Sequence, residues 1–128
     1  MYAFSTVIDG PFDAAVRHLT DTLKEHGPFG VVSDVDVAGI LNKKLGMSKR
    51  PYRILGACNP KLANQVIEGD PDAGVLLPCN ILVSEQEDGR VKVVFQDPVA
   101  LLSVVDNPAA KEVGETATTM LKKVMENL

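Results

Sequence analysis

Apolar side chains recur along this chain at two different periods, which separate helices from strands. After the turn Asp9-Gly10-Pro11, apolar residues follow at steps of three and four, and this spacing predicts a helix that ends at Gly27. The face consists of Phe12, Ala15, Val16, Leu19 and Leu23. A stripe of the same period predicts a long helix that opens at Asn107-Pro108. Its residues are Ala110, Val113, Ala117, Met120 or Leu121, and Val124.

Shorter apolar runs between turn residues predict strands. They cover residues 2–8, 29–35 and 52–57, and the two runs that flank Asp88-Gly89. Asp88-Gly89 predicts a two-residue hairpin turn, which sets Glu87 opposite Arg90 and Glu85 opposite Lys92 as pairs of opposite charge. This register places Asn80, Leu82, Val93 and Phe95 on one face, and Cys79, Ile81, Val83 and Val94 on the other. Since both faces are apolar beyond the charged tip, we expect both to be covered, the second one by another subunit.

Asparagine or aspartate precedes proline at three places, and each place opens a stretch with helical character. Asn59-Pro60, Asp97-Pro98 and Asn107-Pro108 match a favoured helix start, with the capping side chain first and proline at the first helical position. Asp36 is expected to cap a further short helix through Leu45. Together with the strands, these elements predict an α+β fold in which helices pack on an antiparallel sheet.

Composition and charge limit the possible partners. A chain of 128 residues, 45% hydrophobic and 23% charged, predicts a single domain over residues 1–128. The net charge of −4 argues against nucleic acid and anionic membranes as partners. We expect a cytoplasmic protein, because no apolar run is long enough to span a membrane and the N-terminus does not resemble a signal peptide.

One segment departs from this acidic balance. Five cations fall within eleven residues that contain no acid. They are Lys43, Lys44, Lys49, Arg50 and Arg53. The segment is either a solvated basic loop or a small positive patch for an anionic ligand.

The two cysteines, Cys58 and Cys79, are both followed by asparagine. Cys58 lies just outside a predicted helix N-terminus, a position that can lower the pKa of a thiol. If the strands around this helix pair antiparallel, the two cysteines approach each other. The alternative is that both are inert buried residues, as free cysteines usually are. Asn59 is explained by capping, whereas Asn80 has no such explanation.

Recognised catalytic and metal-binding motifs are absent from the chain. It contains no phosphate-binding loop, no dinucleotide fingerprint, no H-E-x-x-H and no C-x-x-C. The two cysteines and two histidines do not have the spacing of a zinc site. We therefore expect neither a metal nor a cofactor.

Four stretches of the chain resemble one bacterial and archaeal family, catalogued as domain of unknown function 302. They are Lys44-Leu45-Gly46, Tyr52 to Pro60 (YRILGACNP), Leu77-Pro78-Cys79-Asn80, and Asp97-Pro98. The resemblance implies a strand-helix-four strands-helix order like that of the TATA-binding-protein fold, and homodimers. It implies no activity.

Three functions agree with these patterns. The first is a small-ligand-binding or sensing module whose pocket contains Cys58, Asn59, Cys79 and Asn80, with Lys44 and Arg53 meeting an anionic group. The second is a dimeric interaction or structural protein. The third is a thiol-based enzyme or redox sensor, with Cys58 as thiolate and Cys79 resolving, so the sequence leaves open whether the protein is an enzyme.

Overall fold

A five-stranded sheet in the order β1-β5-β4-β3-β2 forms the frame of the structure, and every neighbouring pair of strands is antiparallel. The computed structural model describes residues 1–128. The strands are β1 (Ala3–Ile8), β2 (Gly30–Asp36), β3 (Tyr52–Cys58), β4 (Cys79–Glu85) and β5 (Val91–Gln96). The helices are α1 (Phe12–His26), α2 (Val37–Leu45), α3 (Pro60–Gly69), the 3-10 helix η1 (Pro71–Leu76), α4 (Pro98–Leu102) and α5 (Pro108–Glu126). The α+β prediction, with its order of one strand, a helix, four strands and a helix, is confirmed.

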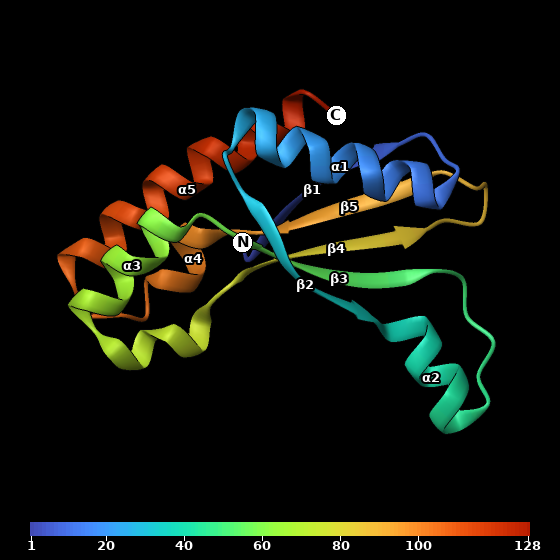
Figure 1. The fold of residues 1–128 in the computed structure, drawn as a ribbon, viewed down its shortest axis with the longest axis horizontal. Coiled ribbons are helices and arrows are strands. Elements are labelled where there is room, and N and C mark those ends of the chain that lie inside the picture. Colours follow the sequence, from blue (N-terminus) through green and yellow to red (C-terminus); the bar gives the residue numbers. More distant parts are fainter.

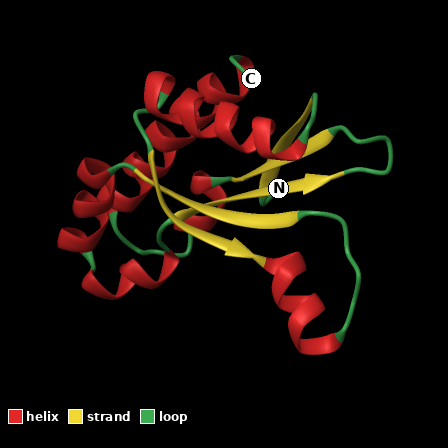
Figure 2. Cartoon of the chain, turned by 45° about the vertical axis from the view of Figure 1, so that its right-hand side comes forward, coloured by secondary structure: helices red, strands yellow, loops and turns green.

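Helices α1 and α5 lie along one face of the sheet and bury the core between them (Figure 1). Four of the five residues predicted for the apolar face of the first helix are buried, with Leu19 and Leu23 fully inaccessible, and Phe12 is partly buried. On α5 the buried position is Leu121, and Met120 is only partly buried. Short α2 stands away from the sheet at one end, as Figure 2 shows. No helix of the structure combines the length and apolarity that crossing a membrane requires.

The β4–β5 hairpin has a different register from the predicted one. Gln86 N–H donates to Arg90 O at 2.8 Å, and Gly89 N–H donates to Gln86 O at 3.0 Å, so the loop has three residues. Gly89 has a φ of 85°. A three-residue loop with glycine in this left-handed conformation is a common hairpin connection. The predicted two-residue turn is therefore wrong by one position.

A shift of one position exchanges the faces of a strand, because side chains alternate across a sheet. Ile81 pairs with Phe95, and Val83 pairs with Val93. All four side chains are fully buried under the helices, whereas the predicted register had separated them onto opposite faces. Opposite-charge pairing of exposed residues at the tip was thus a weaker signal than apolar pairing in the core.

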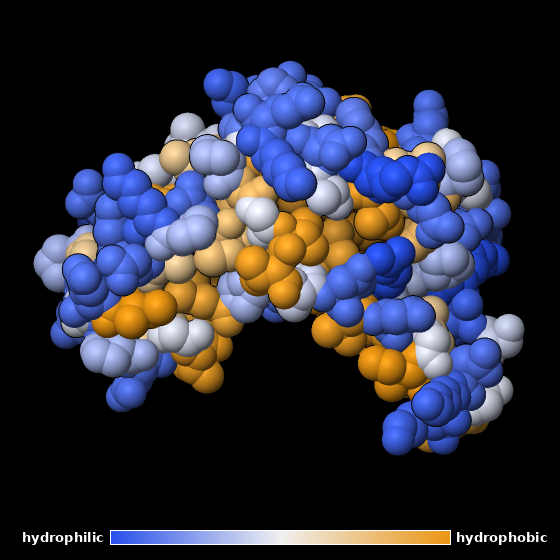
Figure 3. Space-filling model, viewed as in Figure 1, coloured by the Kyte–Doolittle hydropathy of each residue, from blue (hydrophilic) through white to orange (hydrophobic).

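The opposite face of the sheet carries no helix across its middle. We call it the open face; its central residues are Ile54, Leu82 and Val94, which lie side by side on β3, β4 and β5. Figure 3 shows the molecule hollowed on this side, between the lobes that contain η1 and α2. The three apolar side chains are partly exposed there.

The predicted helix caps form as expected. Asn59 Oδ1 accepts a hydrogen bond from Leu62 N–H at 3.3 Å, and Asn107 Oδ1 accepts one from Ala109 N–H at 2.8 Å. Asp97 caps α4 in the same way. Each proline follows at the start of its helix. The recurring Asx-Pro pairs therefore set where three helices begin.

Candidate ligand-binding cavity

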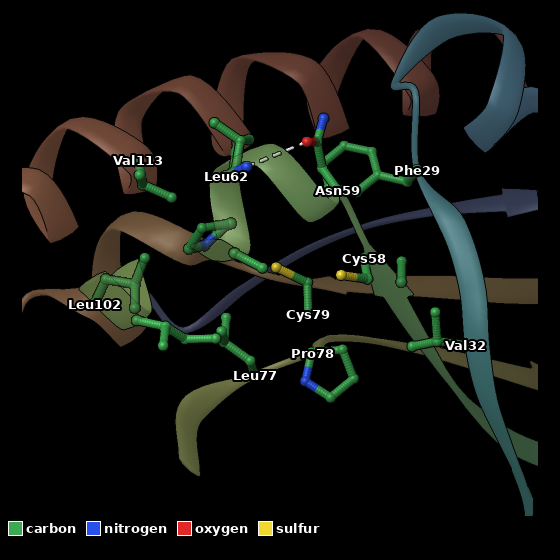
Figure 4. Close-up of a pocket in the computed structure, with 15 residues that line it drawn as sticks. Phe29, Val32, Cys58, Asn59, Leu62, Leu77, Pro78, Cys79, Leu102 and Val113 are labelled. Carbon is green, nitrogen blue, oxygen red and sulfur yellow. Dashed lines mark hydrogen bonds between the residues drawn. The ribbon is translucent and has the colours of Figure 1, made fainter. Parts of the chain in front are cut away.

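The two cysteines lie next to each other at one end of the sheet. β3 and β4 pair antiparallel, and Ala57 stands directly opposite Cys79, so Cys58 is one residue from the partner of Cys79. Both cysteines are free thiols. Figure 4 shows their sulfur atoms side by side and pointing to the same side, toward Leu62 and Leu102. The two cysteines therefore approach each other, as antiparallel pairing of the two strands predicted.

Gly56 lets three segments converge here. A Cβ on Gly56 would collide with the Ser33 hydroxyl from β2 and with the Pro78 ring before β4. Each residue of the motif Gly56-Ala57-Cys58-Asn59-Pro60 thus has its own structural role. Gly56 allows close approach, buried Ala57 fills little space, and Cys58 ends the strand. Asn59 and Pro60 then start α3.

A cavity of about 270 Å³ opens beside the thiols, between the end of the sheet and helices α3, α4 and α5. Twelve of its fifteen lining residues are hydrophobic. On its inner side are Leu102, Val113 and Ala117, each no more than 4% exposed. At its rim are Val32 of β2, which is 64% exposed, and Ile67 of α3, which is 41% exposed. The mouth therefore lies between β2 and α3.

Only part of the apolar face of α3 packs into the core. The spacing places Leu62, Ala63, Val66 and Ile67 on one face of α3. Leu62 and Val66 are buried, whereas Ile67 and Ala63 border the cavity. The apolar face of α3 is wider than its contact with the core, because part of it faces the cavity.

The cavity carries no formal charge. None of its lining residues is an acid, lysine, arginine or histidine. Burial, and to a lesser extent the neighbouring Cys58, raises the pKa of the Cys79 thiol to about 11. Cys79 is therefore protonated at neutral pH. The Asn59 oxygen is already occupied in capping α3.

Three of the six predicted site residues line this cavity, and three do not. Cys58, Asn59 and Cys79 are part of the lining. Asn80 is exposed, and its backbone N–H donates to Gln96 Oε1 at 2.8 Å. Lys44 is exposed on α2. The structure therefore does not bring the cations of the basic segment to the cysteines.

Arg53 lies at the far end of β3 from Cys58. Arg53 and Cys58 are five steps apart along the strand, or about 16 Å. The Arg53 guanidinium donates two hydrogen bonds to the Asp34 carboxylate, and it lies 6.0 Å from the centre of the Phe12 ring. The hydrogen bond to Asp34 is the main cause that raises the pKa of Arg53. This ion pair joins β2 to β3 and places Arg53 outside the cavity.

Two other cations of the basic segment, Lys49 and Arg50, border a separate polar groove. Ser48, Tyr52 and Ser84 also line it. The groove is wide, at about 600 Å³, and its cations are exposed. The cations of the basic segment and the thiol cavity therefore lie in different parts of the molecule.

Sequence reasoning missed the helical half of the lining. Pro98 and Leu102 of α4 and Val113 and Ala117 of α5 all border the cavity. In the sequence they look like ordinary core positions, because an apolar side chain beside a void has the same period as one in packed core. No residue type marked them. Their role follows only from how α4 and α5 sit against the end of the sheet.

The fold and the cavity define an α+β domain built around an apolar pocket at the paired cysteine motifs. A family model described as "Domain of unknown function DUF302" matches residues 4–128, and the chain belongs to this family. The chain is also similar to the protein in the crystal structure of an uncharacterized conserved DUF302 protein from Bacillus stearothermophilus. The two are 27% identical with a TM-score of 0.87, over 98% of this chain and 97% of the other. No curated protein matches the chain.

Proposed function

We propose that this protein is a small-ligand-binding or sensing module and that the cavity beside Cys58 and Cys79 is its binding site. The observation that carries the proposal is a space of about 270 Å³ beside the thiols, lined mainly by hydrophobic residues and reaching from the buried helices α4 and α5 to an exposed rim. Protein interiors contain few voids larger than a water molecule, and ligand pockets are typically concave and mostly apolar.

Small side chains keep this space open. Ala57, Ala63 and Ala117 all border it, from β3, α3 and α5 respectively. A valine or leucine at any of these positions would reduce the volume and add apolar contacts. Small residues on three independent elements therefore support a space that serves binding, since an unfilled apolar cavity costs stability.

The test is a fragment screen observed by protein NMR. We expect some fragments to shift the amide signals of residues 57–63 and 77–79. Ala63→Phe should fill the cavity and abolish these shifts. Ala14→Phe, at a half-buried alanine of α1 outside the cavity, is the matched control and should retain them. The proposal fails if no fragment shifts these signals, or if Ala63→Phe leaves the response unchanged.

The open face favours a second candidate, the dimeric interaction protein. Ile54, Leu82 and Val94 form an apolar centre that no helix covers. Val7 and Val35, which are 38% and 43% exposed, extend the apolar character toward both edges of the sheet. A contiguous apolar surface on a folded protein is typical of an interaction site. The two candidates use different faces and are compatible with each other.

A further inference from the structure

The class of ligand can be inferred from the chemical groups that the cavity offers. Among the lining side chains only the two thiols and the Asn59 amide can form hydrogen bonds, and all the others are aliphatic, proline or phenylalanine. The Asn59 oxygen is committed to Leu62 N–H. The Asn59 amide nitrogen keeps its two donors, but in Figure 4 it points away from the two sulfur atoms. Beside the thiols, Cys58 and Cys79 are therefore the side chains that can meet a ligand's polar atom.

We infer that the natural ligand of this cavity is an uncharged, mainly apolar molecule with an aromatic or unsaturated part, and that carboxylates and phosphates are excluded. This inference rests on the proposed binding function and specifies its ligand. It replaces the anionic ligand that the basic segment had suggested.

The absence of charged residues in the lining excludes an anionic ligand. A carboxylate that leaves water without a partner loses its hydration and gains nothing in return. The cations once expected to meet it lie elsewhere, Lys44 exposed on α2 and Arg53 bonded to Asp34. No lining residue supplies a compensating charge. A neutral molecule does not lose the hydration of a charge when it enters. The cavity therefore favours neutral molecules over anions through the cost of desolvation.

The thiols favour polarisable ligands. Sulfur makes favourable contacts with aromatic rings, and a thiol is only a weak hydrogen-bond donor. Both sulfur atoms face the same side, toward Leu62 and Leu102 (Figure 4). A ring placed there would contact sulfur on one side and aliphatic side chains on the other. Phe29, which is 2% exposed, also contributes an aromatic surface to the lining.

Volume sets the size of the molecule. An apolar cavity of about 150 Å³ in another protein binds benzene, and typical ligand pockets begin at roughly 300 Å³. The cavity here, at about 270 Å³, lies between these values. It therefore suits one substituted ring or two fused rings. Val32 and Ile67 make the rim apolar as well, which favours entry of such a molecule.

The experiment compares two probes of nearly equal shape, 2-naphthol and 2-naphthoate, at neutral pH. Each is titrated into the full chain while the amide signals of residues 57–63 and 77–79 are followed by NMR. We expect 2-naphthol to bind in the cavity with a Kd at least about tenfold lower than that of 2-naphthoate. Equal or tighter binding of 2-naphthoate at these signals would overturn the inference, and so would failure of 2-naphthol to bind.

Three variants locate the effect. Ala63→Phe should weaken 2-naphthol binding by about tenfold or more, while Ala14→Phe should leave it unchanged. Lys44→Ala should also leave it unchanged, because Lys44 is not part of the cavity. A loss of binding in Lys44→Ala would contradict the inference. If 2-naphthol fails but charged fragments bind in the cavity, only the ligand class is wrong, whereas a cavity that binds no fragment refutes the proposed function itself.

Discussion

Cys79 illustrates how the surroundings of a side chain decide its chemistry. It begins β4, and burial, together with the neighbouring Cys58, raises the pKa of its thiol to about 11 from an ordinary value of 9.0. Only the thiolate is a nucleophile. At neutral pH Cys79 is therefore a poor attacking or resolving group, which counts against the thiol-based alternative in its simplest form, with Cys79 resolving.

Alkylation kinetics test whether the Cys79 thiol is unreactive near neutral pH. In a Cys58→Ser variant, where Cys79 is the only thiol, we expect reaction with iodoacetamide at pH 8 to be about tenfold or more slower than for free cysteine, because burial, the larger cause of the raised pKa, remains when Cys58 is replaced. The rate should still be rising at pH 10. The reciprocal Cys79→Ser variant reports on Cys58. Native Cys79 reacting as fast as free cysteine would show that the thiol is not shielded.

The same shift makes stability depend on pH. Between pH 9 and about pH 11 the unfolded state loses the Cys79 proton while the folded state keeps it, so the free energy of unfolding falls as pH rises through this window. Relative to Cys79→Ala, the wild-type protein should lose at most about 2–3 kcal/mol across it. Urea unfolding of both proteins at the two ends of the window measures the difference. A difference that stays constant with pH would contradict the assigned cause.

At the scale of elements, the β4–β5 hairpin depends on the conformation of one glycine. Gly89 has a φ of 85°, which residues with a Cβ rarely adopt. Around it, Asp88 accepts hydrogen bonds from the backbone N–H and the Nε–H of Arg90. These hydrogen bonds also lower the pKa of Asp88, and they brace the three-residue loop.

Gly89→Ala should destabilise the protein by about 1–2 kcal/mol, because it forces an L-residue into the left-handed region. Gly74 provides the matched control. A Cβ there also meets nothing within 4 Å, but its φ lies outside the left-handed region. Gly74→Ala should therefore change stability by no more than about 0.5 kcal/mol. Equal effects of the two substitutions in chemical denaturation would show that the loop does not hold this register.

At the scale of the whole molecule, the sheet separates the two candidate sites by face and position. Helices α1 and α5 bury one face, and the cavity lies at one end of it beneath α3 and α4. The other face is open around Ile54, Leu82 and Val94. Antiparallel sheets tolerate one face in water when that face is polar, and this one is apolar at its centre.

If a second copy covers the open face, light scattering at micromolar concentration should give twice the monomer mass. Leu82→Lys places a charge at the centre of this face and should convert the dimer to monomer. Thr119→Lys introduces the same residue at an exposed position of α5, away from the open face, and should not. A wild-type protein that is monomeric at this concentration would exclude the dimer as its working state.

Local chemistry explains what the sequence determined by itself. The order of elements, the buried faces of α1 and α5, and the caps Asn59, Asp97 and Asn107 were all predictable. Each depends on residues a few positions apart along the chain, where spacing and side-chain type are sufficient. The proximity of the two cysteines was predictable for a related reason, because antiparallel pairing of β3 and β4 places the end of one beside the start of the other.

Only the tertiary structure decided the register of the hairpin, the lining of the cavity and the position of Arg53. The register depends on whether the loop has two or three residues, and Asp88-Gly89 is compatible with both. The cavity lies where α3, α4 and α5 meet the end of the sheet, and apolar residues follow the same sequence pattern in packed core and beside a cavity. Arg53 bonds Asp34 from the neighbouring strand, a contact between residues nineteen positions apart. Such contacts are set by how whole elements pack. The two cysteine motifs therefore indicated where the cavity lies, while the fold determined that its lining is apolar.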